Sequence, residues 1–257
     1  MELTQNTILI TGGTSGFGYQ FASQLLALGN TVIITGRDQS KLDQTKKQLP
    51  QVHTFQSDVS DPNAIIQLYK NVTQQFPELN ILINNAGEMR TINLQDPTID
   101  LQNITREIEI NLMGPIRMIQ QFLPHLKTKK TAAILNVTSG LALVPFPISP
   151  IYGATKSGLR SYTKSLRVQL KNTNIKVFEL VAPGANTLLN DKFENMDGFD
   201  SKNNMEPDKI VQAAIKGLET NKLEIYPGIA NVIKIMSRIA PKFALSQTSK
   251  VGAKMMQ

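Results

Sequence analysis

The sequence predicts an α/β fold in which about seven parallel strands form a doubly wound sheet with helices on both faces. Short apolar runs alternate with longer stretches of helical periodicity along almost the whole chain. The first apolar run is followed at once by a glycine-rich turn and then by a helical stretch. The 257 residues contain no linker, repeat or low-complexity tract, so we expect one domain over residues 1–257.

The expected strands are the short apolar runs. They cover residues 7–10, 31–35, 52–56, 81–84, 132–137, 176–181 and 223–225. The expected helices lie between them, at residues 19–28, 41–49, 61–76, 103–126, 152–171 and 208–220. The pair Asp61-Pro62 is typical of a helix start, because Asp caps backbone amides and Pro fits the first turn. Strands and helices that alternate in this way place ligands at the carboxyl ends of the strands.

The composition excludes several kinds of chemistry. The chain has no cysteine, which removes disulfides, thiolate metal sites and a cysteine nucleophile. Its two histidines, His53 and His125, lack clustered acidic neighbours, so we expect no metal site and no Ser-His-Asp triad, and we place both at a strand edge or a helix end. The sequence begins with no signal-peptide pattern, and no apolar run reaches the ~18 residues of a membrane span. We therefore expect a cytoplasmic protein.

Most of the net positive charge lies near the C-terminus. Of a formal net charge of +7, residues 222–257 supply six basic side chains against the single acidic residue Glu224. Surfaces that bind nucleic acid interleave aromatic with basic residues, but this segment has only Tyr226 and Phe243. We therefore expect no nucleic-acid partner.

Residues 229–245 form an expected helical segment with an apolar face and a basic face. The apolar face carries Ile229, Val232, Ile233, Met236, Ile239 and Phe243, and the basic face carries Lys234, Arg238 and Lys242. Such a segment can contact an anionic membrane peripherally or guide an amphiphilic substrate to a pocket. The pattern favours the alternative, a final helix packed on the sheet or on a second subunit, and Pro241 limits a continuous helix.

A glycine-rich turn follows the first expected strand. It reads Thr11-Gly12-Gly13-Thr14-Ser15-Gly16-Phe17-Gly18, and strand, glycine turn and helix in this order are typical of a dinucleotide-binding site. Gly12, Gly16 and Gly18 permit a tight turn, close approach of the backbone to a pyrophosphate and close helix packing. The helix N-terminus adds amides and a positive dipole. We expect Thr14, Ser15 and Phe17 beside the bound nucleotide as well.

A tyrosine and a lysine form the candidate acid/base pair. Tyr152 and Lys156 lie four residues apart, and Ser139 lies thirteen residues upstream of Tyr152. On a helix, positions i and i+4 share a face, so the ammonium can lie beside the phenol. A neighbouring cation lowers a pKa that is ~10 in free tyrosine. We therefore expect Tyr152 to act as acid or base, with the Ser139 hydroxyl on the same substrate oxygen.

Further motifs follow in order along the chain. They are Asp58-Val59, Asn84-Asn85-Ala86-Gly87, Asn111, Ser139 and the Tyr152/Lys156 pair. Together with the glycine turn they make the chain resemble the short-chain dehydrogenase/reductase family in its compact single-domain form, which has a Rossmann fold. The resemblance implies a catalytic tetrad that consists of Asn111, Ser139, Tyr152 and Lys156.

The resemblance also implies the cofactor contacts. Asp58 and Val59 would flank the adenine, and the turn of Asn85, Ala86 and Gly87 would support the central strand and the cofactor. Tyr152 and Lys156 would contact the nicotinamide ribose and ring. Members of the family usually have Pro-Gly and, three residues further, a Thr that binds the carboxamide. Here Pro183 and Gly184 are followed by Thr187 after only two residues, so either Thr187 keeps the role with a shifted turn or the loop is rearranged.

The end of the second expected strand bears on cofactor choice. Family members that prefer NAD usually carry an acidic residue there, whereas this chain has Gly36 and Arg37. A guanidinium binds the 2′-phosphate that a carboxylate would repel. We therefore expect NADP(H) rather than NAD(H), with Arg37 and Ser15 as phosphate contacts.

The resemblance implies an oxidoreductase that interconverts a small carbonyl and an alcohol by hydride transfer. The alternative is a non-catalytic NADP-binding sensor or scaffold protein, although such relatives often lack the Tyr or Lys present here. An extended sugar-nucleotide epimerase shares Tyr-x-x-x-Lys but needs a longer chain.

The resemblance also concerns the lid and the assembly. Residues 188–205 lie where the family has its mobile substrate lid, and the resemblance implies a homodimer or homotetramer. The tail resembles bacterial oxidoreductases named for an association with D-alanyl-lipoteichoic-acid gene clusters, which suggests a lipid-linked substrate.

Overall fold

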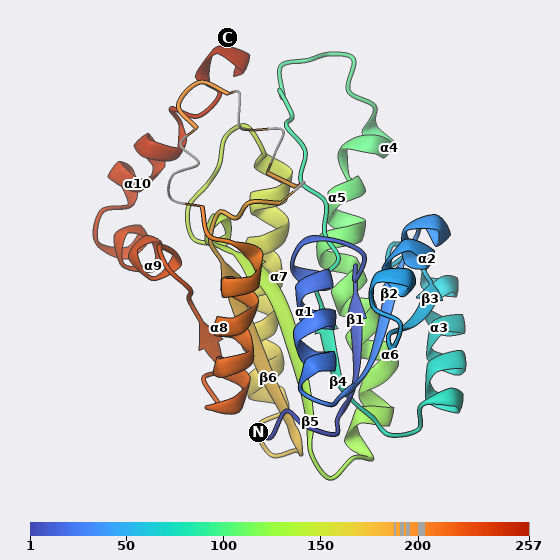
Figure 1. Cartoon of the computed structure of the whole chain (residues 1–257). Helices are drawn as coiled ribbons and strands as arrows, with labels where there is room; N and C mark the ends of the chain where they lie inside the picture. The colour runs from blue at the N-terminus through green and yellow to red at the C-terminus, as the bar shows by residue number, and fades with distance from the viewer. Residues whose placement is uncertain (188, 191–192, 194–195, 200–203, 257) are drawn as a thin grey trace.

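A sheet of seven parallel strands runs through the centre of the molecule, with helices on both faces (Figure 1). The computed structural model describes residues 1–187, 189–190, 193, 196–199 and 204–256. The strand order is β3-β2-β1-β4-β5-β6-β7, so the order reverses between β1 and β4. The predicted fold class is confirmed, and the reversal marks the point where ligands bind in sheets of this kind.

The strands occupy the predicted apolar runs. Their bounds are β1 Thr7–Thr11, β2 Thr31–Gly36, β3 His53–Gln56, β4 Leu79–Asn84, β5 Ala132–Ser139, β6 Ile175–Ala182 and β7 Glu224–Ile225. The strand β5 is buried over its whole length and extends to Ser139, two residues beyond the predicted end. As a result Ser139 lies at the carboxyl end of a central strand.

The larger helices cover the two faces of the sheet. They are α1 Gly16–Ala27, α2 Gln39–Gln48, α3 Pro62–Gln75, α6 Gly114–Lys127, α7 Pro150–Gln169 and α8 Pro207–Glu219. Apolar side chains of α1, α2 and α8 pack on one face, and those of α3, α6 and α7 pack on the other. The carboxylates of Asp38 and Asp61 accept hydrogen bonds from the first amides of α2 and α3, as capping residues do.

The single long helix expected over residues 103–126 is interrupted. The structure has the short helices α4 Leu101–Ile104 and α5 Arg106–Ile108, then a π-helical turn, η1 Glu109–Met113, before α6 begins. Pro115 explains the interruption, because it has no N–H to donate to the carbonyl four residues earlier, which is that of Asn111. The amide of Gly114 bonds the carbonyl of Glu109, five residues back. The π turn is therefore centred on Asn111.

The C-terminal segment forms two helices rather than one. They are α9 Ala230–Ile239 and α10 Pro241–Thr248, and the break falls at Pro241, as the sequence indicates. His53 lies in the edge strand β3, and His125 lies in the last turn of α6. Among the described residues, no helix is both long and apolar enough to cross a bilayer, and no cluster of His, Cys, Asp or Glu could hold a metal ion.

Candidate active site

One cleft of about 910 Å³ opens at the carboxyl ends of the strands. Its walls come from the glycine-rich turn, from the turn after β4, from the ends of β5 and β6, and from the start of α7. Predicted cofactor residues that line it are Gly12, Thr14, Ser15, Gly16, Phe17, Arg37, Asp58, Val59, Asn85, Ala86, Gly87, Tyr152, Lys156, Pro183 and Thr187. The two predicted site residues outside its walls are Gly18 and Asn111. The fold thus brings most of the predicted site to one place.

The glycine-rich turn is shaped by contacts that only glycine allows. Gly12 has φ +66, and a Cβ built there would lie 2.9 Å from the backbone of Ala86. Gly18 is buried beneath the turn, where a Cβ would lie 2.0 Å from the carbonyl oxygen of Gly12. Helix α1 therefore packs directly on the turn, and its first amides face the cleft side.

The turn after β4 is fastened to the glycine-rich turn. The amide side chain of Asn85 donates to the carbonyl oxygens of Thr11 at 3.0 Å and Gly12 at 3.1 Å. In return, the Thr11 hydroxyl oxygen accepts the backbone N–H groups of Asn85 and Ala86, each at 3.0 Å. Asn85 therefore holds the two cofactor-side turns together.

Ser139, Tyr152 and Lys156 meet in the cleft, and all three are buried. The Tyr152 phenol lies close enough to the Ser139 side chain for Ser139 to lower its pKa. The Lys156 ammonium lies 5.7 Å from the centroid of the Tyr152 ring and donates to the carbonyl oxygen of Val137 at 3.0 Å. The phenol, the hydroxyl and the ammonium therefore face the same space.

The pKa of Tyr152 is raised in the structure, whereas the sequence predicts that it is lowered. Burial raises the pKa of Tyr152 to about 12, the hydrogen bond with Ser139 lowers it in part, and the charge of Glu107 raises it further. Burial lowers the pKa of Lys156 to about 8. The prediction was wrong because it counted the neighbouring charge but not the loss of water around both groups, and because the ammonium is directed to Val137.

The buried lysine leads to a prediction about stability and pH. The pKa of Lys156 falls from 10.5 to about 8 on folding, so between these values the unfolded chain holds a proton that the folded chain has lost. The contribution of Lys156 to the free energy of unfolding therefore rises with pH in this window, by up to about 3 kcal/mol. Below the window both states are protonated, and the cost of burying the ammonium persists.

The measurement is urea denaturation of the wild type and of Lys156→Met at pH ~7.5 and ~10. We expect the wild type to gain about 2–3 kcal/mol relative to the variant between the two pH values. Lys164→Met, on the exposed side of the same helix, controls for loss of a lysine. A constant difference between wild type and Lys156→Met would contradict the lowered pKa.

Asn111 lies behind the cleft rather than in it. It is fully buried, and its side chain exchanges hydrogen bonds with the backbone of Glu88 at 2.8 and 2.7 Å. A Cβ built at Gly87 would lie 3.3 Å from the Asn111 amide oxygen and 3.5 Å from the Lys156 ammonium. Asn111 thus braces the loop that follows β4 close to Lys156, from a π turn that the sequence pattern did not predict.

Thr187 remains beside the cofactor side of the cleft despite the shortened spacing. The preceding residues form a bridge in which Ala185 pairs with Met205, and the Thr187 methyl lies 3.6 Å from a Cβ built at Gly16. The loop therefore carries Thr187 to the glycine-rich turn. Within the expected lid, residues 188, 191–192, 194–195 and 200–203 lie outside the described residues. Phe193 and Phe199 line the cleft.

Arg37 lies at the open end of the cleft, with its side chain 58% exposed. One guanidinium nitrogen lies 4.0 Å from the carboxylate of Glu88, which is paired with Arg106 at 3.1 Å. Lys41 lines the cleft beside Arg37. Sequence reasoning missed Lys41 and Arg106; the Asp38 cap, which places Lys41 in the first turn of α2, is the signal that could have identified Lys41.

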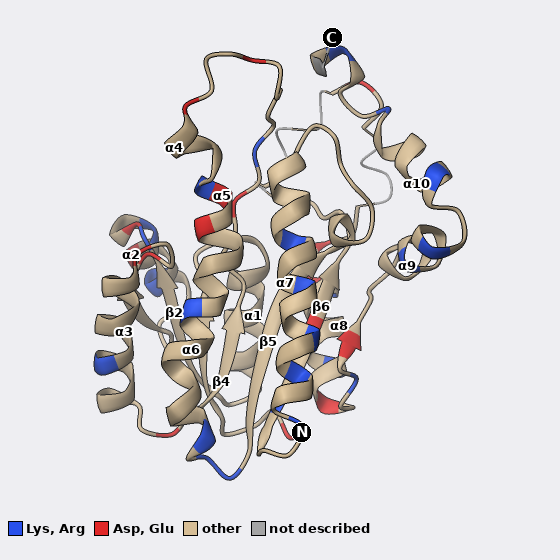
Figure 2. Ribbon diagram, turned by 180° about the vertical axis from the view of Figure 1, so that it is seen from behind, with Lys and Arg blue, Asp and Glu red and all other residues tan. Residues whose placement is uncertain are grey.

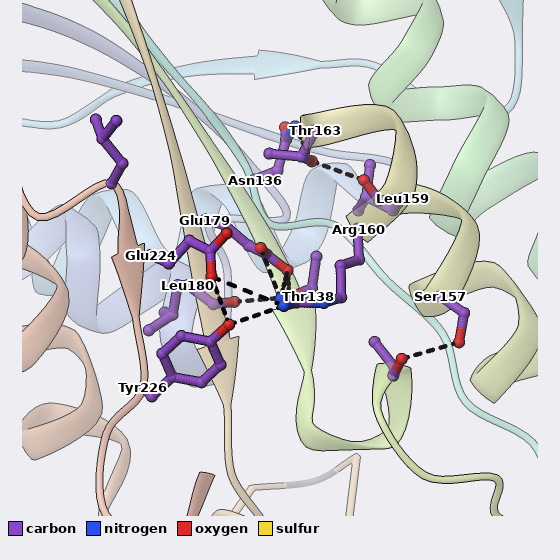
Figure 3. A network of polar contacts seen from close by, with 12 residues as sticks. Asn136, Thr138, Ser157, Leu159, Arg160, Thr163, Glu179, Leu180, Glu224 and Tyr226 are labelled. Carbon is purple, nitrogen blue, oxygen red and sulfur yellow. Dashed lines mark hydrogen bonds and ion pairs between the residues drawn. The ribbon is translucent and has the colours of Figure 1, made fainter. Parts of the chain in front are cut away.

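A buried ionic network lies beneath the cleft (Figure 3). Arg160, one turn after Lys156 on α7, donates to both carboxylate oxygens of Glu179 at 2.8 Å and to the Tyr226 hydroxyl at 2.8 Å. Thr138 of β5 donates to the same carboxylate at 2.7 Å. The network joins α7, β5 and β6, and so maintains the spacing between the helix that carries Tyr152 and Lys156 and the strand that ends at Ser139.

A doubly wound sheet, a glycine-rich nucleotide turn and a Ser-Tyr-Lys group on one cleft define an oxidoreductase of the nicotinamide-dependent class. The family model of short chain dehydrogenases matches residues 6–197, and the chain belongs to this family. It is 41% identical over 225 residues to the uncharacterized oxidoreductase DltE of Bacillus subtilis (strain 168). The aligned region covers 88% of this chain and 89% of that protein.

Solved structures show the same architecture. A 3-ketoacyl-(acyl-carrier-protein) reductase from Brucella melitensis complexed with NADH matches with a TM-score of 0.76 and 27% identity, over 84% of this chain and 91% of that one. A short chain dehydrogenase from Burkholderia cenocepacia J2315 in complex with NADP matches with a TM-score of 0.83 and 22% identity, over 96% and 99% of the two chains. Proteins of this fold thus bind either dinucleotide.

Proposed function

We propose that the protein is an NADP(H)-dependent oxidoreductase that interconverts a carbonyl and an alcohol, with Tyr152 as the general acid/base. The observation that carries the proposal is the meeting of Ser139, Tyr152 and Lys156 on a cleft whose other end is the glycine-rich turn. The cleft fits a nicotinamide dinucleotide, because Gly12 and Gly18 let the glycine-rich turn pack closely against Ala86 and α1, and the start of α1 at Ser15, Gly16 and Phe17 then lines the cleft.

The chain's own residues supply proton transfer and orientation. When bound, the nicotinamide supplies or accepts the hydride. Ser139 and Tyr152 hydrogen-bond the substrate oxygen, and Tyr152 donates its proton as negative charge develops there. The raised pKa keeps the Tyr152 phenol protonated at neutral pH, which is the form that donates a proton to a carbonyl oxygen. Lys156 would hold the nicotinamide ribose, and its ammonium would return a proton to the Tyr152 phenolate after the substrate oxygen has been protonated.

The substrate end of the cleft supports an apolar carbonyl. Phe146 and Phe193 lie with ring centroids 5.9 Å apart, and both line the cleft with Met89 and Leu141. An apolar wall stabilises a hydrocarbon substituent by removing its surface from water. We therefore assign the substrate to aldehydes or ketones with an apolar substituent.

Turnover tests the proposal against the alternative of a non-catalytic sensor. We expect oxidation of NADPH in the presence of at least one compound from a panel of aliphatic and aromatic aldehydes, ketones and lipid-like carbonyls. Tight NADPH binding without turnover on any of them would favour the sensor.

The expected homodimer or homotetramer, formed through α6 and α7, remains a proposal, and its support is the 67% exposed Val168 on α7.

Arg37 provides the test of cofactor choice. If its guanidinium binds the 2′-phosphate with a charge-assisted hydrogen bond of about 1.5–3 kcal/mol, Arg37→Ala weakens NADPH binding roughly ten- to a hundredfold. The affinity for NADH should stay within about twofold, since NADH has no 2′-phosphate. Fluorescence titration with both nucleotides measures the effect, and Lys70→Ala on the exposed side of α3 is the charge-matched control. Equal losses for NADPH and NADH would refute the role of Arg37.

A further inference from the structure

The two C-terminal helices carry large apolar side chains that no described part of the chain covers. Figure 1 shows α9 and α10 at the margin of the molecule, apart from the helices that cover the sheet. We define the C-terminal patch by five exposed residues: Val232 (54%), Ile235 (50%), Ile239 (73%), Phe243 (56%) and Leu245 (40%). Exposed apolar side chains gathered in this way mark an interaction surface.

The geometry of α9 separates the patch from the side that packs on the protein. Val232, Ile235 and Ile239 have i, i+3 and i+7 spacing, so they lie along one face of the helix. Ile233 points the other way: its Cδ1 lies 3.2 Å from a Cβ built at Gly140, and it lines the cleft. The expected packing on the protein therefore accounts for one side of α9 and leaves the other exposed.

The charged residues of α9 and α10 are all basic. No acidic residue follows Glu224 in the sequence, whereas Lys234, Arg238, Lys242, Lys250 and Lys254 do. In Figure 2 the ribbon of α9 and α10 carries blue segments, which mark Lys and Arg, and no red ones. Within the described part of the chain, Arg238 and Lys242 are exposed and form no salt bridge, while Lys254 pairs with Asp197 at 2.5 Å. The partner surface must therefore be apolar and anionic.

This charge decides between a second copy of the chain and a lipid surface. In a two-fold dimer through the patch, the same basic side chains would face each other across the interface, and they would repel. An anionic bilayer attracts each Lys or Arg near its surface and accepts the apolar side chains between its headgroups. The basic charge and the exposed apolar side chains therefore both favour an anionic bilayer as the partner surface.

We propose that α9 and α10 form a docking surface for an anionic lipid bilayer. The same helices border the cleft, since Ile233 of α9 and Thr248 of α10 both line it. Docking places the substrate end of the cleft beside the membrane surface, within reach of an amphiphilic carbonyl compound held there. The docking itself does not depend on the proposed reaction, and it is measured without nucleotide or substrate.

Vesicle sedimentation of the full chain tests the proposal. The probes are vesicles of phosphatidylcholine alone and vesicles of about equal parts phosphatidylglycerol and phosphatidylcholine, at low and high salt. We expect binding to the anionic vesicles at low salt, weaker binding at high salt and none to phosphatidylcholine. Replacing Arg238 and Lys242 together by Gln should lower the partition coefficient about thirtyfold, at about fivefold per charge.

The apolar part of the patch is tested by its own variant. Replacing Ile239 and Phe243 together by Ser should lower the partition coefficient at least about tenfold. The matched controls are Leu94→Ser with Leu101→Ser, which are 62% and 84% exposed elsewhere, and Lys47→Gln with Lys70→Gln. Both controls should bind as the wild type does, and thermal unfolding confirms that all variants are folded.

Three outcomes would overturn the proposal. They are absence of binding to anionic vesicles, equal binding to both kinds of vesicle, and unchanged binding of the patch variants. Sedimentation equilibrium without lipid identifies the competing occupant: a dimer that the Ile239/Phe243 double variant dissociates would make the patch a contact between copies. NADPH turnover is measured separately, so a failure of docking leaves the proposed reaction intact, and the reverse also holds.

Discussion

Replacing Tyr152 by Phe should lower carbonyl reduction about a hundredfold to ten-thousandfold, which is the range that general acid catalysis contributes. The substitution removes one oxygen, and with it the proton that the substrate oxygen needs as negative charge develops. The aromatic ring stays in the apolar cluster of Met89, Phe146, Ile148 and Phe193, so the fold and the cleft are retained. The measurement is kcat/KM with the best carbonyl substrate of the panel.

The control for Tyr152→Phe is another phenol on the same helix. Tyr162 lies further along α7, outside the cleft, and it packs at the edge of the apolar layer between α7 and the sheet. Tyr162→Phe should keep activity within about twofold of the wild type. The loss in Tyr152→Phe should lie mainly in kcat, because the proton is transferred in the chemical step. Near-normal turnover by Tyr152→Phe would exclude Tyr152 as the general acid.

Replacing Arg160 by Met should lower the free energy of unfolding by about 3–5 kcal/mol. The Glu179 carboxylate is 0% exposed, and among the described residues the substitution would leave it with the Thr138 hydroxyl as its one hydrogen-bonding partner. The cost arises from this uncompensated charge rather than from a large net value of the ion pair. Chemical denaturation measures the change.

A double variant separates the charge effect from lost packing. In Arg160→Met combined with Glu179→Gln no unpaired carboxylate remains, so we expect recovery of about half or more of the lost free energy. Lys216→Met at the exposed pair of Lys216 and Glu219 should change stability by less than about 0.5 kcal/mol. A cost below about 1 kcal/mol for Arg160→Met would show that the network carries little of the stability.

This network adjoins the residues of the candidate site. Thr138 directly precedes Ser139 in β5, and Arg160 follows Lys156 by one turn of α7 (Figure 3). The Glu179 carboxylate accepts from both Thr138 and Arg160, which fixes the strand against the helix. None of these contacts has a short-range sequence pattern, since Thr138, Arg160 and Glu179 meet only when the parallel strands are in register.

Much of the fold could be predicted because its determinants are local. Apolar runs bounded by polar turns indicated all seven strands, and Asp61 with Pro62 indicated the start of α3 within one residue. The prediction of one long helix over residues 103–126 was wrong. The sequence contains Pro115, but Pro is also tolerated near the start of a helix, so its presence alone does not show where a helix is interrupted. Whether a helix bends, restarts or forms a π turn depends on packing such as that of Gly114 against Val59.

By itself the sequence determined the alternation of strands and helices, the glycine turn and the spacing of Ser139, Tyr152 and Lys156, because each of these depends on neighbours a few residues away. Tertiary structure alone decided that burial raises the pKa of Tyr152 and lowers that of Lys156, and that Asn111 braces a loop instead of lining the cleft. It also decided which apolar residues of α9 and α10 stay exposed. Desolvation and exposure depend on segments distant in sequence, so a local pattern carries no information about them.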